Sequence, residues 1–88
     1  MTSAPSRSRD TWKFVGTCVE GQPFLVDGVD AWSPEWRRVP GEAAEVQDPL
    51  YGQLFRFDVY EIDGASGTIR MATGECSANV YLFYVATR

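Results

Sequence analysis

The sequence predicts a mainly β fold, a five- to six-stranded antiparallel sheet curled toward a small barrel, with one short helical turn near residues 33–38. Three observations support this prediction. Apolar and polar residues alternate along residues 51–63, aromatic residues make up 14% of the 88-residue chain, and clusters of turn-forming residues separate the alternating segments. Because aromatic side chains favour strands, we expect a core built largely from rings.

Residues 51–63 form the predicted strand around which the other segments are arranged. Its apolar row consists of Phe55, Phe57 and Val59, and polar or amphipathic residues lie between them. A period of two places this row on one face of the sheet, which we assign to the core. Turn formers at 63–67 return the chain as an alternating segment at 68–74. We therefore expect a hairpin here.

The N-terminal part divides into a tail and a first strand. Residues 1–10 have almost no apolar side chains and are predicted to be a disordered tail, which leaves residues 11–88 as one domain. Residues 11–19 alternate as a strand does. Glu20 and Gly21 separate them from residues 22–27 by the two residues that a tight hairpin uses. These two segments are expected to pair antiparallel.

The segment around Trp32 and Trp36 carries the only helix start signals in the chain. Ser33 is a suitable cap and Pro34 suits a first helical position. The two tryptophans are four residues apart, so in a helical turn they share a face. They either plug one open end of the sheet or form an exposed aromatic contact site.

Two further strands are expected. Residues 42–47 suit a short edge strand, in which Glu42 and Glu45 discourage unwanted pairing. Residues 79–85 are apolar on both alternations, which is typical of a strand covered on both faces. The segment of Trp32 and Trp36 is the expected internal cover, and a partner molecule is the alternative.

The formal net charge of −4 is unevenly distributed along the sequence. Between Gly41 and Asp63 six acidic residues accompany a single base, Arg56. We call these six residues the acidic row: Glu42, Glu45, Asp48, Asp58, Glu61 and Asp63. A nucleic-acid-binding protein needs a Lys/Arg surface, whereas only Arg37 and Arg38 form even a pair. Direct nucleic-acid binding is therefore disfavoured.

The two cysteines and the apolar pattern indicate the compartment. Cys18 and Cys76 can form at most one disulfide and lie in no metal-binding spacing, so apolar filling is favoured over a structural bridge. No apolar run approaches the roughly 20 residues of a membrane span, and no signal-peptide pattern is present. We expect a cytoplasmic protein without membrane contact.

Groups for catalysis are scarce. The chain has no histidine, which removes the commonest general base and metal ligand. The pairs Asp58 with Tyr60 and Glu61 with Asp63 lie at i, i+2 spacing and in principle suit acid–base work on a sugar, but a solvated polar face is favoured. No calcium loop or phosphate-binding glycine pattern appears. We predict that the protein is not an enzyme and has no cofactor.

A small, acidic, aromatic-rich β module without catalytic groups is expected to bind proteins. The hypothesis is a non-enzymatic protein-binding module that blocks a basic surface of its partner, as phage or bacterial inhibitors and immunity proteins of similar size and charge do. The predicted contact residues are the acidic row with Trp32 and Trp36; solubilising charge is the alternative for the row. Three other functions stay open: self-association as a homodimer through the apolar C-terminal strand, small-ligand binding in an aromatic-lined barrel, and carboxylate catalysis in a cleft.

Overall fold

The computed structural model describes residues 6–7 and 11–87. This part of the chain consists of strands and connecting turns, and it contains no helix. The strands are β1 (Ser6–Arg7), β2 (Thr11–Val19), β3 (Leu25–Val26), β4 (Val29–Asp30), β5 (Arg37–Gln47), β6 (Leu54–Gly64), β7 (Gly67–Ser77) and β8 (Val80–Thr87). The predicted mainly β class is confirmed.

The principal sheet has the strand order β1-β5-β6-β7-β8-β2, and all its pairs are antiparallel except β1 with β5. The predicted hairpin of residues 51–63 with residues 68–74 is confirmed as β6 and β7. The predicted pairing of residues 11–19 with residues 22–27 is wrong, because β2 pairs with β8 and β3 pairs with β4 in a separate small sheet. β8 offers β2 a partner along its whole length, whereas Pro23 lacks the N–H that a ladder needs.

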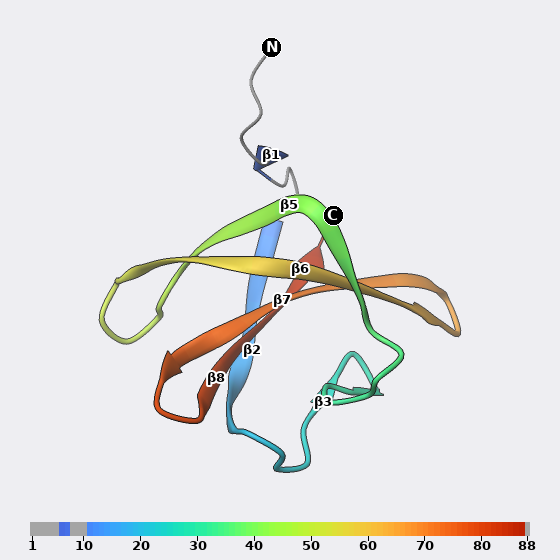
Figure 1. Cartoon of the computed structure of the whole chain (residues 1–88), viewed down its shortest axis with the longest axis horizontal. Coiled ribbons are helices and arrows are strands. Elements are labelled where there is room, and N and C mark those ends of the chain that lie inside the picture. Colours follow the sequence, from blue (N-terminus) through green and yellow to red (C-terminus); the bar gives the residue numbers. More distant parts are fainter. Residues whose placement is uncertain (1–5, 8–10, 88) are drawn as a thin grey trace.

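The sheet curls strongly but is not closed into a barrel, so the barrel part of the prediction is corrected. In Figure 1 the long strands β5 and β6 cross over β8 and β2. Such twist follows from strand sterics and brings the two ends of the sheet toward each other. They enclose what we call the inner core: Ala44, Val46, Phe57, Val59, Ala72, Leu82 and Tyr84, with Trp12 and Phe14 packed against them.

The opposite face of the sheet is covered by residues 20–36. These residues supply Val26 and Ala31 to a second cluster, which we call the outer core and which the sheet completes with Met71 and Phe83. Phe24, Trp32 and Trp36 pack against the cluster. β8 is therefore covered on both faces, with Phe83 at 0% and Tyr84 at 3% exposure. The expectation for residues 79–85, including the tryptophan segment as the cover, is confirmed.

Two glycines make room for aromatic rings. A Cβ built on Gly16 would lie 3.1 Å from the ring of Phe24, which stacks on Phe83 with centroids 4.8 Å apart. A Cβ on Gly74 would lie 2.3 Å from the ring of Phe57. The sequence positions of these glycines therefore determine where a ring can cross a strand.

The predicted helical turn near residues 33–38 is replaced by a β-turn. Trp36 N donates to Ser33 O at 3.4 Å, and Ser33 Oγ accepts from Glu35 N at 3.2 Å, so the expected cap contact is present without a helix. Arg37 and Arg38 already pair with β6. Because Arg37 and Arg38 gain hydrogen bonds in the sheet, the chain leaves the turn after Trp36 and forms no second helical turn. β5 thus begins five residues before the expected edge strand and contains an irregularity between Arg38 and Ala43.

The predicted tail, residues 1–10, falls mainly outside the described residues. Ser6 and Arg7, which belong to it, form β1 and pair with Glu42 and Ala43 of β5. The backbone groups on the outer edge of β5 need partners, which is the physical reason for this short strand. The tail prediction is therefore corrected at these two residues.

Candidate functional site

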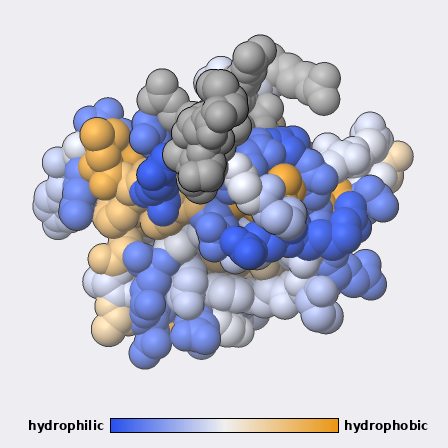
Figure 2. All heavy atoms as spheres, turned by 45° about the horizontal axis from the view of Figure 1, so that its top comes forward, coloured by the Kyte–Doolittle hydropathy of each residue, from blue (hydrophilic) through white to orange (hydrophobic). Residues whose placement is uncertain are grey.

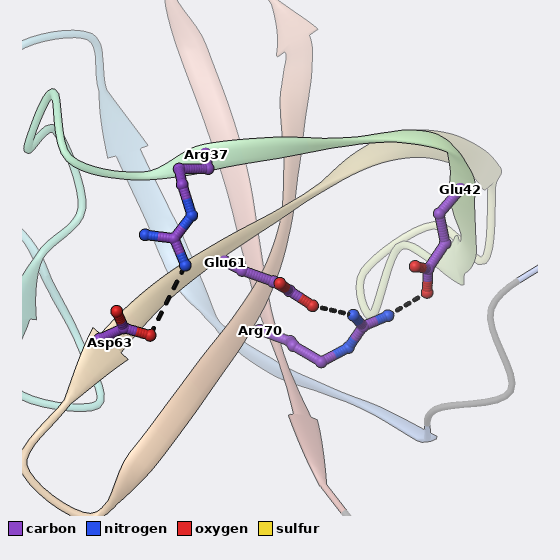
Figure 3. Close-up of polar contacts among 5 residues, drawn as sticks. All are labelled: Arg37, Glu42, Glu61, Asp63 and Arg70. Carbon is purple, nitrogen blue, oxygen red and sulfur yellow. Dashed lines mark hydrogen bonds and ion pairs between the residues drawn. The ribbon is translucent and has the colours of Figure 1, made fainter.

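Arg70 of β7 joins two members of the acidic row. Its guanidinium forms ion pairs and hydrogen bonds with Glu42 of β5 and Glu61 of β6, and about a fifth of its side chain is exposed. Figure 3 shows Arg70 between the two carboxylates, with one nitrogen directed to each. The planar guanidinium suits this double contact. Glu42 and Glu61 thus form a local network with a base that lies outside the row in the sequence.

Two more acids of the row have arginine partners. Arg37 Nη2 lies 3.6 Å from Asp63 Oδ1, and Arg38 Nη1 lies 3.9 Å from Asp58 Oδ1. Figure 3 marks the Arg37–Asp63 pair with a dashed line. These side chains are more than half exposed, so each pair contributes little to stability. The pairs affect the electrostatic field at the surface more than they affect stability, because each arginine cancels most of the potential that its aspartate would produce at a distance.

Asp48 is a structural member of the row. It is 9% exposed, and its carboxylate accepts hydrogen bonds from Tyr51 N at 2.9 Å and from Leu50 N at 3.3 Å. Gly52 N donates to Asp48 O at 2.9 Å in the same turn. Such side-chain contacts are typical of an Asp that opens a turn. Asp48 therefore fixes the turn between β5 and β6 and presents little charge to a partner.

Glu45 completes the row and lies exposed, opposite Arg56 in the β5–β6 register. Five of the six predicted acids lie on β5 and β6, and Asp48 lies in the turn between these strands. Asp58 and Glu61 are an odd number of residues apart on β6, so they lie on opposite faces of the sheet. The six acids are interleaved with Arg37, Arg38 and Arg70, none of which lies between Gly41 and Asp63. The sequence count of six acids against one base therefore overstates the negative field of this surface.

The turn between β5 and β6 carries the most exposed large apolar side chains. Leu50 is 79%, Tyr51 86% and Leu54 73% exposed. Figure 2 shows hydrophobic atoms gathered on the side of the molecule where this turn lies. We call Leu50, Tyr51 and Leu54 the apolar turn. Sequence reasoning missed this surface. The available signal was that Leu50 and Tyr51 lie between the turn formers Pro49 and Gly52, and that Leu54 comes just before the first core residue of the strand.

A groove of about 390 Å³ lies beside the apolar turn. One wall contains Leu50, Tyr51 and Phe55, and the other contains Cys76 and Val80 from the ends of β7 and β8. Leu82 of the inner core also lines it. The groove is therefore continuous with buried apolar surface, so a side chain placed in it would lose contact with water.

Trp32 and Trp36 lie on the other side of the sheet and are partly buried. Trp32 meets Tyr81 and Phe83 edge-on, with ring centroids 5.3 and 5.5 Å apart. Its Nε1 donates to Gln22 O at 2.6 Å, and Trp36 Nε1 donates to Asp30 O at 2.9 Å. Of the two interpretations of these tryptophans, the structure supports the covering role, and a partly open hollow lies between their rings.

Metal-ligand clusters and membrane-spanning helices are absent from the described residues. These residues include no group of three or more Cys, Asp or Glu side chains placed to hold a metal ion, and no helix among them could span a membrane. Cys18 packs against the outer core and Cys76 against the inner core, and both are free thiols. The sheet separates them, which explains why they are not bridged.

No protein-family model, curated protein or solved structure matches this chain.

Proposed function

We propose that the protein is a non-enzymatic protein-binding module that contacts its partner through the apolar turn. The supporting observation is the exposure of Leu50, Tyr51 and Leu54 on a turn that Asp48 holds in one conformation. Large aromatic and aliphatic side chains contribute most of the energy in protein interfaces. A preformed turn also loses little conformational entropy on binding.

The neighbouring groove completes the contact surface. Its apolar walls and its volume of about 390 Å³ suit one or two apolar side chains of a partner. The exposed ring of Tyr51 buries little apolar area within this chain, and contact with the partner would bury it. The groove and the apolar turn therefore act as one surface.

The partner of this proposal is a protein with a basic surface. The chain has a formal net charge of −4, which speeds approach of a positive surface and raises the association rate at low salt. The field guides the approach and the apolar turn holds the complex. An inhibitor or immunity-type role, in which a phage or bacterial module covers a basic surface of its partner, is the form of this function that size and charge favour. Two unbridged thiols suit the cytoplasm.

The fold gives less support to two alternative functions, self-association and ligand binding in a barrel. Self-association through the apolar C-terminal strand requires a free face or edge, whereas β8 is paired with β7 and β2 and covered on both faces. A ligand-binding barrel requires a closed sheet, and this sheet is open.

The test compares captured proteins from a host lysate for four baits: the wild type, Leu50→Ser, Tyr51→Ser and a matched control, Leu25→Ser. Leu25 is 62% exposed and lies in β3, away from the apolar turn. The proposal expects a basic protein that the wild type and Leu25→Ser retain and that both turn variants lose. Equal capture by all four baits, or loss with Leu25→Ser alone, would contradict it.

The thiols provide a second measurement on the purified complex. Cys76 lines the groove, whereas Cys18 lies on the other side of the sheet. A bound partner should slow alkylation of Cys76 and leave the rate at Cys18 unchanged, as followed by mass spectrometry of the two peptides. Protection of Cys18 instead would place the interface on the wrong face. Raising salt from about 0.05 to 0.5 M should slow association, because the Debye length falls several-fold.

A further inference from the structure

Five aromatic rings line a hollow of about 260 Å³ on the face of the sheet opposite the inner core. Trp32 and Trp36 come from the segment that covers the sheet, Tyr60 from β6, and Tyr81 and Phe83 from β8. We call this the aromatic hollow. Its volume lies below the range of about 300–1,000 Å³ of drug-sized sites. The space therefore suits a small group rather than an extended ligand.

The rings are held in place before any ligand arrives. Both indole N–H groups are committed to backbone carbonyls, those of Gln22 and Asp30. The edge-on contacts of Trp32 with Tyr81 and Phe83 fix the rings relative to one another. A ligand thus meets aromatic rings that need not be reorganised, which lowers the entropy cost of binding.

The covering segment carries uncompensated negative charge. Residues 20–36 contain no Lys or Arg and four acids: Glu20, Asp27, Asp30 and Glu35. None of these four carboxylates forms an ion pair with another described residue, in contrast to the acids that face Arg37, Arg38 and Arg70. The negative charge of the covering segment is therefore not neutralised, whereas arginines neutralise much of the charge of the acidic row.

Carboxylates also lie near the tyrosine hydroxyls of the hollow. Burial raises the pKa of Tyr81, and the charges of Glu20 and Glu75 raise it further. Burial also raises the pKa of Tyr60; the charge of Asp58 adds to this effect and that of Arg38 opposes it. Arg38 lies 3.9 Å from Asp58, so the nearest base has its own partner. Both hydroxyls consequently stay neutral at pH 7. The charges near Tyr60 offset each other, whereas the surroundings of Tyr81 are negative.

We infer that the aromatic hollow binds a quaternary ammonium group. Electron-rich ring faces attract such a cation, the surrounding carboxylates add a long-range attraction, and methyl groups fill the apolar space without needing hydrogen bonds. The hydroxyls of Ser33 and Thr73, which also line the hollow, are already engaged with Glu35 N and Leu82 O. A ligand that must donate or accept several hydrogen bonds would find few partners there.

Two sources share this chemistry: a free quaternary amine such as choline, and a trimethylated lysine on a protein. This inference does not depend on the proposed function, because the apolar turn borders the inner core and the aromatic hollow the outer one. Loss of binding at one site is expected to leave the other intact.

The experiment titrates the 88-residue protein with choline and with 3,3-dimethyl-1-butanol, the neutral isostere of choline, at constant ionic strength. Tryptophan fluorescence and the ring-current shift of the ligand methyl protons report binding. The expected result is saturable binding of choline, with about 3- to 30-fold weaker binding of the neutral alcohol, which is the range that cation–π attraction gives. Absence of saturable binding, or equal affinity for both ligands, would overturn the inference.

Charge variants test the location without disturbing the packing. Glu20→Gln combined with Glu75→Gln removes the two carboxylates nearest Tyr81, and the new amide at position 75 keeps an oxygen that can accept from Asn79 N. We expect weaker choline binding and unchanged alcohol binding. Glu61→Gln combined with Asp63→Asn is the matched control, because it also removes two carboxylates. Both residues lie an odd number of positions from Tyr60 on β6 and so on the opposite face. An equal loss of choline affinity in the control and in the test variant would show that only the net charge of the protein matters, and would overturn the proposed site.

Trp36→Leu provides the direct test of the ring wall, with circular dichroism to establish that the variant folds. A folded Trp36→Leu protein that binds choline as the wild type does would contradict the inference; if this variant unfolds, the charge variants decide. A peptide containing trimethyl-lysine and the same peptide with unmodified lysine then separate the two sources. Tighter binding of the methylated peptide than of choline supports a protein ligand, and the reverse order supports a free amine.

Discussion

Replacing Gly74 with alanine puts a methyl group where the ring of Phe57 lies. The built Cβ would be 2.3 Å from Phe57 Cδ1, which no real packing tolerates. Phe57 cannot easily move away, because it stacks on Phe55 at 5.2 Å and contacts Tyr84 at 6.3 Å between centroids. The two positions are therefore expected to be strongly coupled, and a double-mutant cycle measures that coupling.

The magnitudes follow from burial. Phe57 is 6% exposed, so Phe57→Ala should cost about 3–5 kcal/mol through lost burial and the cavity left behind. Gly74→Ala should cost about 1–3 kcal/mol through overpacking. With Phe57 already shortened, the added methyl group enters the cavity, and the lower entropy of the unfolded chain contributes about 0.4–1 kcal/mol in its favour. Gly74→Ala should then be neutral or stabilising.

The assay is urea unfolding of the wild type, both single variants and the double variant. A chain of 88 residues has a free energy of unfolding of about 4–13 kcal/mol, so Phe57→Leu replaces Phe57→Ala if the latter does not fold. Leu54→Ala, on the same strand but 73% exposed, is the control and should change stability by less than about 0.5 kcal/mol. Additive costs in the cycle, or a Phe57→Ala protein with the midpoint of the wild type, would refute the packing argument.

Three further predictions concern the rest of the fold. Deleting residues 1–10 should lower the melting temperature by no more than a few degrees, because the deleted part of the described structure is the two-residue β1; a larger drop would show that the segment is docked. Dithiothreitol should leave the melting temperature unchanged, since Cys18 and Cys76 lie against different cores; a clear drop would reveal a disulfide. Alkaline pH should destabilise the protein. Burial, Asp48 and Cys76 raise the pKa of Tyr84, whose hydroxyl donates to Gln47 O at 3.0 Å, so the stability from its neutral form is complete below about pH 10 and is lost as pH rises through the raised pKa. Tyr84→Phe should flatten that part of the pH profile, as measured by urea midpoints from pH 8 to 11.

Local patterns identified most of the strands but not all of their partners. Period-two alternation placed β2, β6 and β8 correctly, and the turn formers at 63–67 specified the β6–β7 hairpin. Alternation describes only the faces of a strand, so it carried no information on the β2–β8 pairing, whose partners are distant in the sequence. The tight-turn signal at Glu20 and Gly21 was a local preference that the long-range ladder overrode.

The candidate site shows the same division. The sequence placed the six acids in two adjacent segments, and five of them lie on β5 and β6. Arg70, however, reaches Glu42 and Glu61 from a strand that the linear count treated as separate. A count along the chain cannot register charge neutralisation across a ladder. Tyr60 and Tyr81 were visible as aromatic strand residues, yet their convergence with Trp32 depends on how residues 20–36 cross the sheet.

The irregularity in β2 sets the phase of that strand. Phe14 pairs with Tyr84 and Gly16 with Phe83, so Val15 is the extra residue of a bulge. Residues before the bulge pack on the inner core and Cys18 beyond it on the outer core, which makes one strand a component of both. Deletion of Val15 would remove the bulge and leave Phe14 opposite Tyr84 and Gly16 opposite Phe83. Deletion of a regularly paired residue such as Thr17 would instead act like a frameshift, because Cys18 would move to the inner face. Deletions should thus be tolerated at the bulge and far less in the regularly paired parts of β2, where the spacing of the residues carries as much structural information as their identity.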